Sequence, residues 1–239
     1  MDFKNVYDDN KRAESYAALE FPGTYYLAYR DLPEIFTKYI NGKKALDFGC
    51  GTGRSTRFLK KHGYDAVGID ISGSMINIAK EYDPIGKYFL VDGSDFSVLN
   101  NERYDLITAI FTFDNIPGKD NRKELLTVLK DLLTDNGKIV LLDSADRIYV
   151  NEWTSFSTIG FPENRNAKSG EKVKIIMKDV DDKRPVEDII WFDEDYRELF
   201  SSAKLKLLES IEPLGREGEN IDWINETKLA PWIIYILGK

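Results

Sequence analysis

The chain has 239 residues, 42% of them hydrophobic, and a formal net charge of −8 at pH 7. This length is sufficient for one full core, and we expect a single domain over residues 1–239. An acidic chain without a long Lys or Arg run is poorly suited to bind a phosphate backbone, so we expect no nucleic-acid partner. The polar, acidic N-terminus and the lack of a membrane-length apolar run predict a cytoplasmic protein without a membrane partner. With one cysteine and one histidine, we expect no disulfide framework and no bound metal.

The first 42 residues are rich in tyrosine and are predicted to form a helical lid. From residue 43 to residue 145, short apolar runs alternate with amphipathic stretches, which is typical of βαβ units around a parallel sheet. The strands are expected at Lys44–Phe48, Asp65–Asp70, Gly86–Val91, Tyr104–Ala109 and Gly137–Leu142. The helices are expected at Gly53–His62, Gly73–Tyr82 and Asp120–Leu133, with a turn at Asn136-Gly137.

Residues 146–192 depart from this alternation and are predicted to form an irregular loop and an inserted hairpin. The two strands of the hairpin, Lys172–Lys178 and Val186–Phe192, are expected to cover one edge of the sheet. Residues 193–239 are predicted to complete the sheet with a helix over Glu194–Ala203 and two strands, Lys206–Ile211 and Trp232–Leu237.

The most informative motif is the run Ala45-Leu-Asp-Phe-Gly-Cys-Gly-Thr-Gly-Arg54, a buried strand that ends in three glycines and enters a helix. Glycines at alternate positions let a ligand lie against the backbone. A dinucleotide fingerprint requires a glycine where Arg54 stands, and no Walker-type Gly-Lys-Ser or Gly-Lys-Thr follows. Asp47 precedes the loop, where a carboxylate repels a diphosphate but can hold an ammonium group, directly or through water.

Two further carboxylates stand at the ends of the next two predicted strands. Asp70, 17 residues beyond Gly53, is suited to bind the two hydroxyls of a ribose. In Asp92-Gly93-Ser94, a carboxylate and a backbone N–H can read the edge of an adenine. Ammonium, ribose and adenine sites at three consecutive strand ends together describe S-adenosylmethionine.

With these motifs, the stretch from Ala45 to Leu142 resembles the class I S-adenosylmethionine-dependent methyltransferases, within the broad type 11 group that includes ubiquinone and menaquinone methyltransferases. Tyr104-Asp-Leu-Ile107 and Leu129-Lys-Asp-Leu-Leu-Thr-Asp-Asn-Gly137 belong to the same resemblance. It implies an α/β, Rossmann-like three-layer sandwich with a seven-stranded, mostly parallel sheet. The last strand, Trp232–Leu237, is then antiparallel.

The resemblance implies S-adenosyl-L-methionine as cofactor and S-adenosyl-L-homocysteine as product. The cofactor contacts are expected from the strand ends and glycine loop, and from Tyr16 and Arg30 of the lid, where Arg30 is suited to pair with the methionyl carboxylate. The strand-end and loop residues are Asp47, Gly49, Cys50, Gly51, Gly53, Asp70, Ile71, Met75, Asp92, Gly93, Ser94, Ile110 and Phe111.

The methyl acceptor is expected to meet the segment after the fourth strand. Candidate acceptor contacts are Phe113, Asp114, Trp153, Trp191 and Trp223, and candidates for a catalytic base are Asp114, Tyr16 and Tyr25. His62 is followed by Gly63 at a predicted helix end, where an imidazole complements the helix dipole, so we expect no histidine base.

These features predict transfer of a methyl group from S-adenosylmethionine to an oxygen, nitrogen or carbon atom of an unidentified small molecule, by a monomer or homodimer. A non-catalytic S-adenosylmethionine-binding protein and a protein methyltransferase remain alternatives, and an NAD-dependent oxidoreductase is a weaker one. Phe113-Asp-Asn-Ile116 replaces the Asn/Asp-Pro-Pro-aromatic motif of enzymes that methylate nucleic acids.

Overall fold

A computed structural model describes residues 10–93 and 95–239, so the expected contact of Ser94 lies outside the described residues. The helices are α1 (Asn10–Ala17), α2 (Thr24–Arg30), α3 (Leu32–Tyr39), α4 (Arg54–Lys61), α5 (Gly73–Tyr82), α6 (Lys119–Asp131) and α7 (Asp193–Ser202). The strands are β1 (Lys44–Phe48), β2 (Asp65–Asp70), β3 (Lys87–Leu90), β4 (Tyr104–Ile110), β5 (Leu133–Ser144), β6 (Phe156–Ser157), β7 (Lys172–Met177), β8 (Val186–Ile189), β9 (Lys206–Ile211) and β10 (Trp232–Gly238). Short 3₁₀ helices are η2 (Ser97–Leu99), η3 (Phe113–Asn115), η4 (Asp146–Val150) and η5 (Pro162–Asn166).

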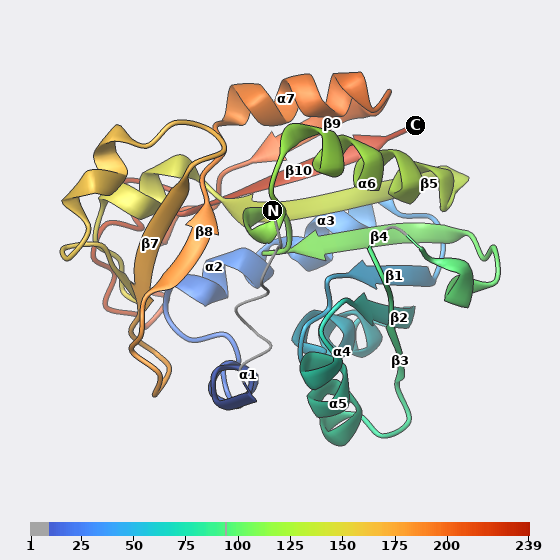
Figure 1. Ribbon diagram of the computed structural model, residues 1–239, viewed down its shortest axis with the longest axis horizontal. Coiled ribbons are helices and arrows are strands. Elements are labelled where there is room, and N and C mark those ends of the chain that lie inside the picture. The colour runs from blue at the N-terminus through green and yellow to red at the C-terminus, as the bar shows by residue number, and fades with distance from the viewer. Residues whose placement is uncertain (1–9, 94) are drawn as a thin grey trace.

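Seven strands form the main sheet in the order β3-β2-β1-β4-β5-β10-β9 (Figure 1). Strands β1 to β5 pair in parallel, and β10 lies antiparallel between β5 and β9. The predicted seven-stranded, mostly parallel sheet with an antiparallel last strand is therefore confirmed.

Alternate residues of the central strands pack into two separate cores, one on each face of the sheet. Leu106 and Val140 belong to the core under α2, α3 and α4, whereas Ile107 and Leu141 belong to the core under α6 and α7. All four side chains are fully buried. A parallel sheet covered by helices on both faces requires this uninterrupted apolar sequence, and the predicted three-layer sandwich is confirmed (Figure 1).

Two strands, β5 and β8, differ from their predicted bounds by more than one residue. Strand β5 begins at Leu133, and its pairing with β4 shifts register after Tyr104, so the predicted Asn136-Gly137 turn is a bulge within the strand. Strand β8 ends at Ile189, before the predicted end at Phe192, because Phe192 is the N-cap residue of α7.

The predicted hairpin is present as β7 and β8, and β6 pairs with β7 to make a second, three-stranded antiparallel sheet. Its predicted position at an edge of the main sheet is wrong, since the outer strands of that sheet are β3 and β9. The small sheet instead lies beyond the carboxyl ends of the central strands (Figure 1). The reason is that its apolar side chains, including Ile175 and Met177, are buried against the lid and line a cavity there.

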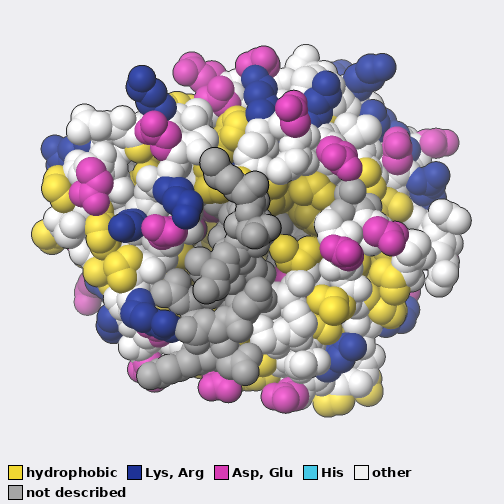
Figure 2. Space-filling view, viewed as in Figure 1, with side chains coloured by type: hydrophobic (Ala, Val, Ile, Leu, Met, Phe, Trp, Pro, Cys, Tyr) yellow, Lys and Arg dark blue, Asp and Glu magenta, His cyan; other side chains and the backbone are white. Residues whose placement is uncertain are grey.

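The face seen in Figure 2 carries acidic and basic side chains side by side. Within the described ranges, no helix has the length and apolar character needed to cross a membrane.

Candidate functional site

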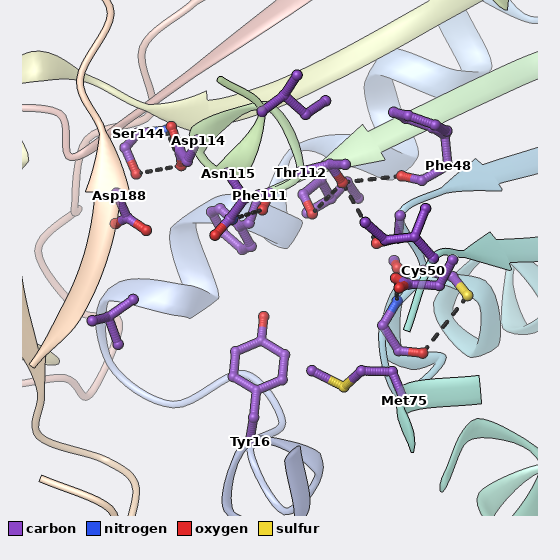
Figure 3. A pocket seen from close by; sticks show the side chains of 18 of the residues that line it. Tyr16, Phe48, Cys50, Met75, Phe111, Thr112, Asp114, Asn115, Ser144 and Asp188 are labelled. Atoms are coloured by element: carbon purple, nitrogen blue, oxygen red, sulfur yellow. Dashed lines mark hydrogen bonds between the residues drawn. The ribbon is translucent and has the colours of Figure 1, made fainter. Parts of the chain in front are cut away.

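A cavity of about 440 Å³ lies at the carboxyl ends of β1, β2, β4 and β5. The chain leaves β1 toward β2 on one side and returns as β4 on the other, and ligands of open α/β sheets bind at such a switch point. The lid helices α1 and α2 and the small sheet enclose the space, with Tyr16 on one side and Asp114 and Asp188 on another (Figure 3). Its volume is in the range of small-ligand sites.

The glycine loop forms one wall of the cavity. Gly49, Gly51 and Gly53 have φ values of +70°, +53° and +80°, which favour glycine. A Cβ atom on Gly49 would lie 2.3 Å from Cγ2 of Thr112, whereas a Cβ on Gly51 would meet no atom within 4 Å. Gly49 is therefore required by packing, and the open space beside Gly51 is available to a ligand. Gly53 is the N-cap residue of α4 and does not line the cavity.

Asp47 holds the glycine loop from behind. Its side chain is fully buried and accepts hydrogen bonds from the hydroxyls of Ser55 (2.6 Å), Thr56 (2.6 Å) and Thr108 (2.9 Å). Burial raises the pKa of Asp47 to about 6, although these three hydrogen bonds oppose the shift. Asp47 is not on the cavity wall, so the structure gives it a positioning role instead of the expected contact with an ammonium group.

Asp70 lies where the sequence places it, at the end of β2 on the cavity wall. Its Oδ2 accepts the backbone N–H of Gly51 at 2.8 Å, and its Oδ1 accepts that of Ser72 at 2.8 Å. The carboxylate therefore fixes the glycine loop to the start of α5 while it faces the cavity. Cys50, Ile71 and Met75 line the same wall.

The third strand end contributes backbone to the wall. Gly93 lines the cavity with a φ of +56°, and a Cβ there would meet no atom within 4 Å. The Asp92 side chain is exposed and does not line the cavity, so the expected contact of this carboxylate with an adenine is not in place.

The lid contributes Tyr16, Tyr25 and Tyr29, which line the cavity together with Arg54. Arg54 donates to the hydroxyl of Tyr16 and to the carbonyl of Glu20, both at 2.8 Å. Its guanidinium lies 5.0 Å and 5.1 Å from the ring centres of Tyr16 and Tyr25. Among the described lining residues, Arg54 is the one Lys, Arg or His side chain. In the sequence, Arg54 serves only as evidence against a dinucleotide site, although its place directly after the glycine loop indicates a cavity position.

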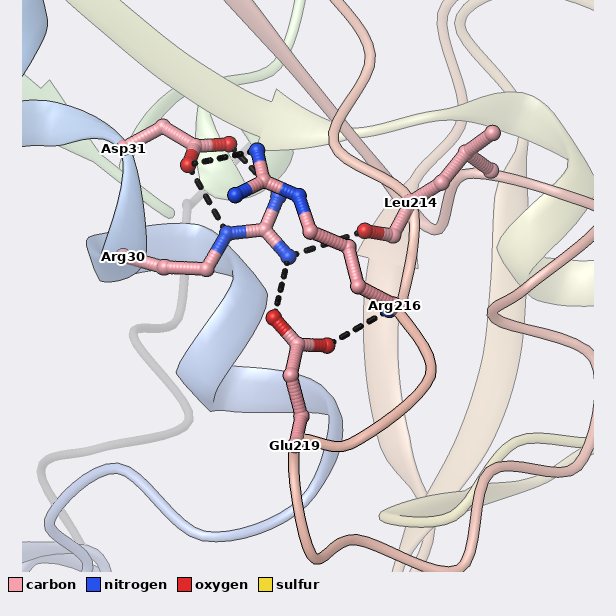
Figure 4. Close-up of polar contacts among 5 residues, drawn as sticks. All are labelled: Arg30, Asp31, Leu214, Arg216 and Glu219. Carbon is pink, nitrogen blue, oxygen red and sulfur yellow. Dashed lines mark hydrogen bonds and ion pairs between the residues drawn. The ribbon is translucent and has the colours of Figure 1, made fainter.

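Arg30 does not reach the cavity. Its guanidinium binds both carboxylate oxygens of Asp31, at 2.8 and 2.7 Å, and also Glu219 (2.7 Å) and the carbonyl of Leu214 (2.9 Å) (Figure 4). Asp31 and Glu219 raise the pKa of Arg30 further above its usual range through these hydrogen bonds. Its donors thus attach the segment before β10 to α2, and the structure does not support the expected pairing with a methionyl carboxylate.

An aromatic wall faces the glycine loop across the cavity and consists of Tyr25, Phe111, Phe156 and Trp232. The Trp232 ring lies 4.7 Å from Phe111 and 5.5 Å from Phe156, and Tyr25 lies 5.0 Å from Phe156. Phe111 has a φ of +57°, which is costly for a bulky side chain and typical of functional positions. Ile110 and Phe111, both expected at this strand end, line the cavity.

Two carboxylates, Asp114 and Asp188, line the acceptor side of the cavity (Figure 3). Oδ2 of Asp114 accepts the hydroxyl of Ser144 at 2.7 Å and its N–H at 3.2 Å, and Oδ2 of Asp188 accepts the hydroxyl of Tyr149 at 3.1 Å. Burial raises the pKa of Asp114. Burial and the charge of Asp114 raise the pKa of Asp188 to about 8.

The remaining expected acceptor contacts lie elsewhere. Phe113 is fully buried against Phe48, and Trp153 is fully buried with its Nε1 donating to the carbonyl of Ile148. Trp191 stacks on Arg122, and the ring of Trp223 packs against Gly215. None of these four side chains lines the cavity: Phe113, Trp153 and Trp191 are buried in the core, and Trp223 is partly buried against its surface.

Trp232 and Asp188 line the cavity and were not singled out from the sequence. An antiparallel strand begins where its parallel neighbours end, which places Trp232, the first residue of β10, at the carboxyl edge. Asp188 shares a face of β8 with the buried Val186, two residues before it, so an inward carboxylate was readable from the pattern. His62 caps α4 and its Nδ1 lies 2.8 Å from the carbonyl of Phe58, as the sequence indicated. Within residues 10–93 and 95–239, no three His, Cys, Asp or Glu residues group as a candidate metal site.

A family model for a methyltransferase domain matches residues 22–180, more than half of the chain. An uncharacterized methyltransferase from Alkaliphilus oremlandii is 28% identical over 52% of this chain and 62% of its own length. A ubiquinone biosynthesis O-methyltransferase from Coxiella burnetii is 31% identical over 33% of this chain and 35% of its own length. The chain thus covers less than two thirds of these curated relatives.

Solved structures share the fold over nearly the whole chain. An S-adenosylmethionine-dependent methyltransferase from Clostridium acetobutylicum superimposes with a TM-score of 0.62 at 15% identity, covering 98% of this chain and 96% of that one. The CcbJ methyltransferase from Streptomyces caelestis gives a TM-score of 0.64 at 14% identity, covering 92% and 99%. The chain belongs to the methyltransferase domain family and has the fold of the class I S-adenosylmethionine-dependent methyltransferases, a fold and family of methyl-transferring enzymes.

Proposed function

We propose that this protein transfers the methyl group of S-adenosylmethionine to a small molecule held in the same cavity, in the cytoplasm and without a nucleic-acid or membrane partner. The observation that supports this most is the continuity of the cavity. Its lining includes Gly51, Asp70 and Gly93 on one side and Asp114, Asp188 and the aromatic wall on the other. A donor and an acceptor bound in these two halves would meet between them.

The donor half fits S-adenosylmethionine on the basis of open space and donor chemistry. The clear space beside Gly51 and Gly93 lets a ligand lie against the backbone at two neighbouring strand ends. Each oxygen of Asp70 accepts one backbone N–H, which fixes the carboxylate on the cavity wall at the end of β2, where it suits a ribose hydroxyl. We assign the methionyl carboxylate to Arg54, since it is the cationic side chain of the described lining.

The acceptor half fits a small molecule better than a protein segment. The lid helices, the small sheet and the aromatic wall surround it, and the whole cavity of about 440 Å³ must hold both reactants. Methyl transfer from a sulfonium is an in-line displacement, so holding the acceptor atom close to the methyl carbon provides much of the acceleration. Asp114, Tyr16 and Tyr25 line the cavity and stay candidates for proton removal.

Calorimetric titration with S-adenosylhomocysteine and with NAD tests the donor assignment. We expect the adenosyl ligand to bind and NAD not to bind. Asp70→Ala is expected to lower the affinity for S-adenosylhomocysteine about 100-fold. The ligand loses two hydrogen bonds to the charged carboxylate, and the glycine loop loses its attachment to Asp70. Asp65→Ala is the matched control, since this exposed carboxylate at the opposite end of β2 pairs only with Lys87 among the described contacts. Binding of NAD alone, or equal effects of both variants, would contradict the proposal.

A further inference from the structure

The acceptor half of the cavity carries two carboxyl groups that come from different elements. Asp114 lies on η3 and Asp188 on β8, and both line the cavity near Ser144 and Tyr149 (Figure 3). Asp114 is only 5% exposed. Within the described part of the chain, neither carboxylate has an ion-pair partner within 4.0 Å. A buried carboxylate without a partner is costly, so a ligand that brings positive charge is favoured here.

The nearby cation, Arg122, does not fill this role. Its charge lowers the pKa of Asp114, but Arg122 is fully buried outside the cavity. Its guanidinium donates to the carbonyl of Ile116 and to the hydroxyl of Tyr196, and it stacks on Trp191 at 4.3 Å. Arg122 therefore supports Asp114 from behind and leaves the cavity face of that carboxylate open.

Each carboxylate keeps one oxygen for a ligand. The hydrogen bonds of Asp114 and Asp188 to the protein all end on Oδ2, from Ser144 and from Tyr149. No described residue donates a hydrogen bond to Oδ1 of either side chain. Two free acceptor oxygens facing one small cavity match a group with several N–H donors, whereas a hydroxyl offers a single donor and no charge.

The surrounding rings favour a cation as well. Tyr149, Phe156 and Trp232 line this half of the cavity, and the faces of aromatic rings attract positively charged nitrogen. An acceptor with an apolar body and one charged end would bury the body against these rings and direct its charge to the carboxylates.

From this geometry we infer that the methyl acceptor is an amine, which enters as an ammonium ion and is held by Asp114 and Asp188. The inference rests on the proposed function. The ammonium gives one proton to the Asp188 carboxylate, and the freed nitrogen lone pair forms a bond to the methyl carbon. The carbon–sulfur bond breaks, its electron pair stays on sulfur, and the products are S-adenosylhomocysteine and the N-methylated ammonium.

The acid strength of Asp188 is compatible with this step. Its pKa, raised to about 8 by burial and by Asp114, is closer to that of an ammonium group than the pKa of an ordinary carboxyl. A base whose pKa lies near the working pH is the more effective proton acceptor.

The test measures binding of an amine panel to the protein saturated with S-adenosylhomocysteine, by calorimetry. The panel contains primary and secondary amines whose nitrogen is joined to an aromatic ring through a saturated carbon chain, so that each is an ammonium ion at neutral pH, and each is matched to the alcohol with the same carbon skeleton. We expect the best amines to bind about tenfold or more tighter than their matched alcohols, because one hydrogen bond between charged groups contributes about that much affinity. Amines that bind no tighter than the alcohols across the panel would overturn the inference.

Variants locate the effect. Asp188→Asn and Asp114→Asn are each expected to weaken amine binding about tenfold and to leave alcohol binding within about twofold. Glu187→Gln is the matched control, because Glu187 neighbours Asp188 on β8 but points to the opposite face, where it pairs with Lys172 outside the cavity. An amine preference that survives in both Asn variants would also overturn the inference.

The affinity for S-adenosylhomocysteine separates the two proposals. If the wild-type protein does not bind this ligand, the proposed function fails. If it binds the ligand but shows no amine preference, only the amine inference fails. If the melting curve of one Asn variant shows that it does not fold, the other variant and the wild-type panel still test the amine inference.

Discussion

The two halves of the cavity are built in different ways. The donor half comes mainly from the glycine loop, together with Asp70 and Gly93 at the next strand ends, and its ligand-facing groups are largely backbone. The acceptor half combines side chains far apart in the sequence, including Tyr25, Asp188 and Trp232. The first half depends on local backbone conformation, and the second depends on the packing of the lid and the small sheet around the strand ends.

The largest expected effect is on the donor half, at Gly49. A Val side chain there meets Thr112 at a backbone φ of +70°, a conformation that costs a residue with a Cβ about 1 to 2 kcal/mol before any clash. We expect Gly49→Val to lower the free energy of unfolding by about 3 kcal/mol and to lower the affinity for S-adenosylhomocysteine by more than about 100-fold. Calorimetry and denaturant unfolding measure both.

Gly73→Ala is the control for this substitution. Gly73 begins α5 without a positive φ, and a Cβ there meets no atom within 4 Å. We expect this variant to differ from wild type by less than about 1 kcal/mol in stability and to bind the ligand normally. Equal losses in the two variants would show that the loop conformation is not what the site requires.

On the acceptor half, Asp188 makes stability depend on pH. Its pKa rises on folding from 3.8 to about 8, so the folded protein holds the proton more strongly and stability falls as pH rises between these values. Asp188→Asn removes this loss. Between pH 5 and pH 8, we expect the free energy of unfolding of the variant to rise by about 2 kcal/mol relative to that of wild type, less than the full shift implies because Asp188 is partly exposed and solvent screens its charge.

Unfolding in denaturant at several pH values tests this prediction. Asp114 raises and the Tyr149 hydroxyl lowers the pKa of Asp188, and both face it in the cavity. Glu187→Gln on the opposite face of β8 is expected to follow the wild-type curve. Parallel curves for wild type and Asp188→Asn would contradict the account.

The smallest expected effects distinguish two arginines. Arg54→Lys keeps the charge but loses the planar guanidinium, which can donate two parallel hydrogen bonds to a carboxylate. We expect this variant to lower the affinity for S-adenosylhomocysteine about tenfold. Arg30→Lys is expected to change this affinity less than about twofold and to lower stability by about 1 kcal/mol, since Arg30 binds Asp31 and Glu219 outside the cavity (Figure 4). Titration of both variants checks the difference, and a larger affinity loss at Arg30 would reverse the assignment.

The same contrast explains what the sequence could predict. The sheet, its layers, the glycine loop and the place of Asp70 follow from apolar alternation and from glycine spacing, which are local signals. Gly49, Gly51 and Gly53 adopt the conformations their residue type indicates. The local signal failed at Asp47, where the carboxylate is fully satisfied by three hydroxyls that only the packing of α4 and β4 brings near.

The acceptor half was predicted less well because its members meet only through tertiary structure. Asp114, Tyr16 and Tyr25 were chosen by position near a strand end or in the lid, and all three line the cavity. Trp153 and Trp191 were chosen because they lie outside the common core, and a large ring packs as well in the interior as in a cavity.

The most direct test of the central claim is a crystal structure of the protein with S-adenosylhomocysteine bound. The account predicts the ribose at Asp70, the methionyl carboxylate at Arg54 and the sulfur directed past Phe111 toward Asp114 and Asp188. A ligand bound outside this cavity, or with its sulfur facing away from the two carboxylates, would contradict the claim that one cavity holds donor and acceptor.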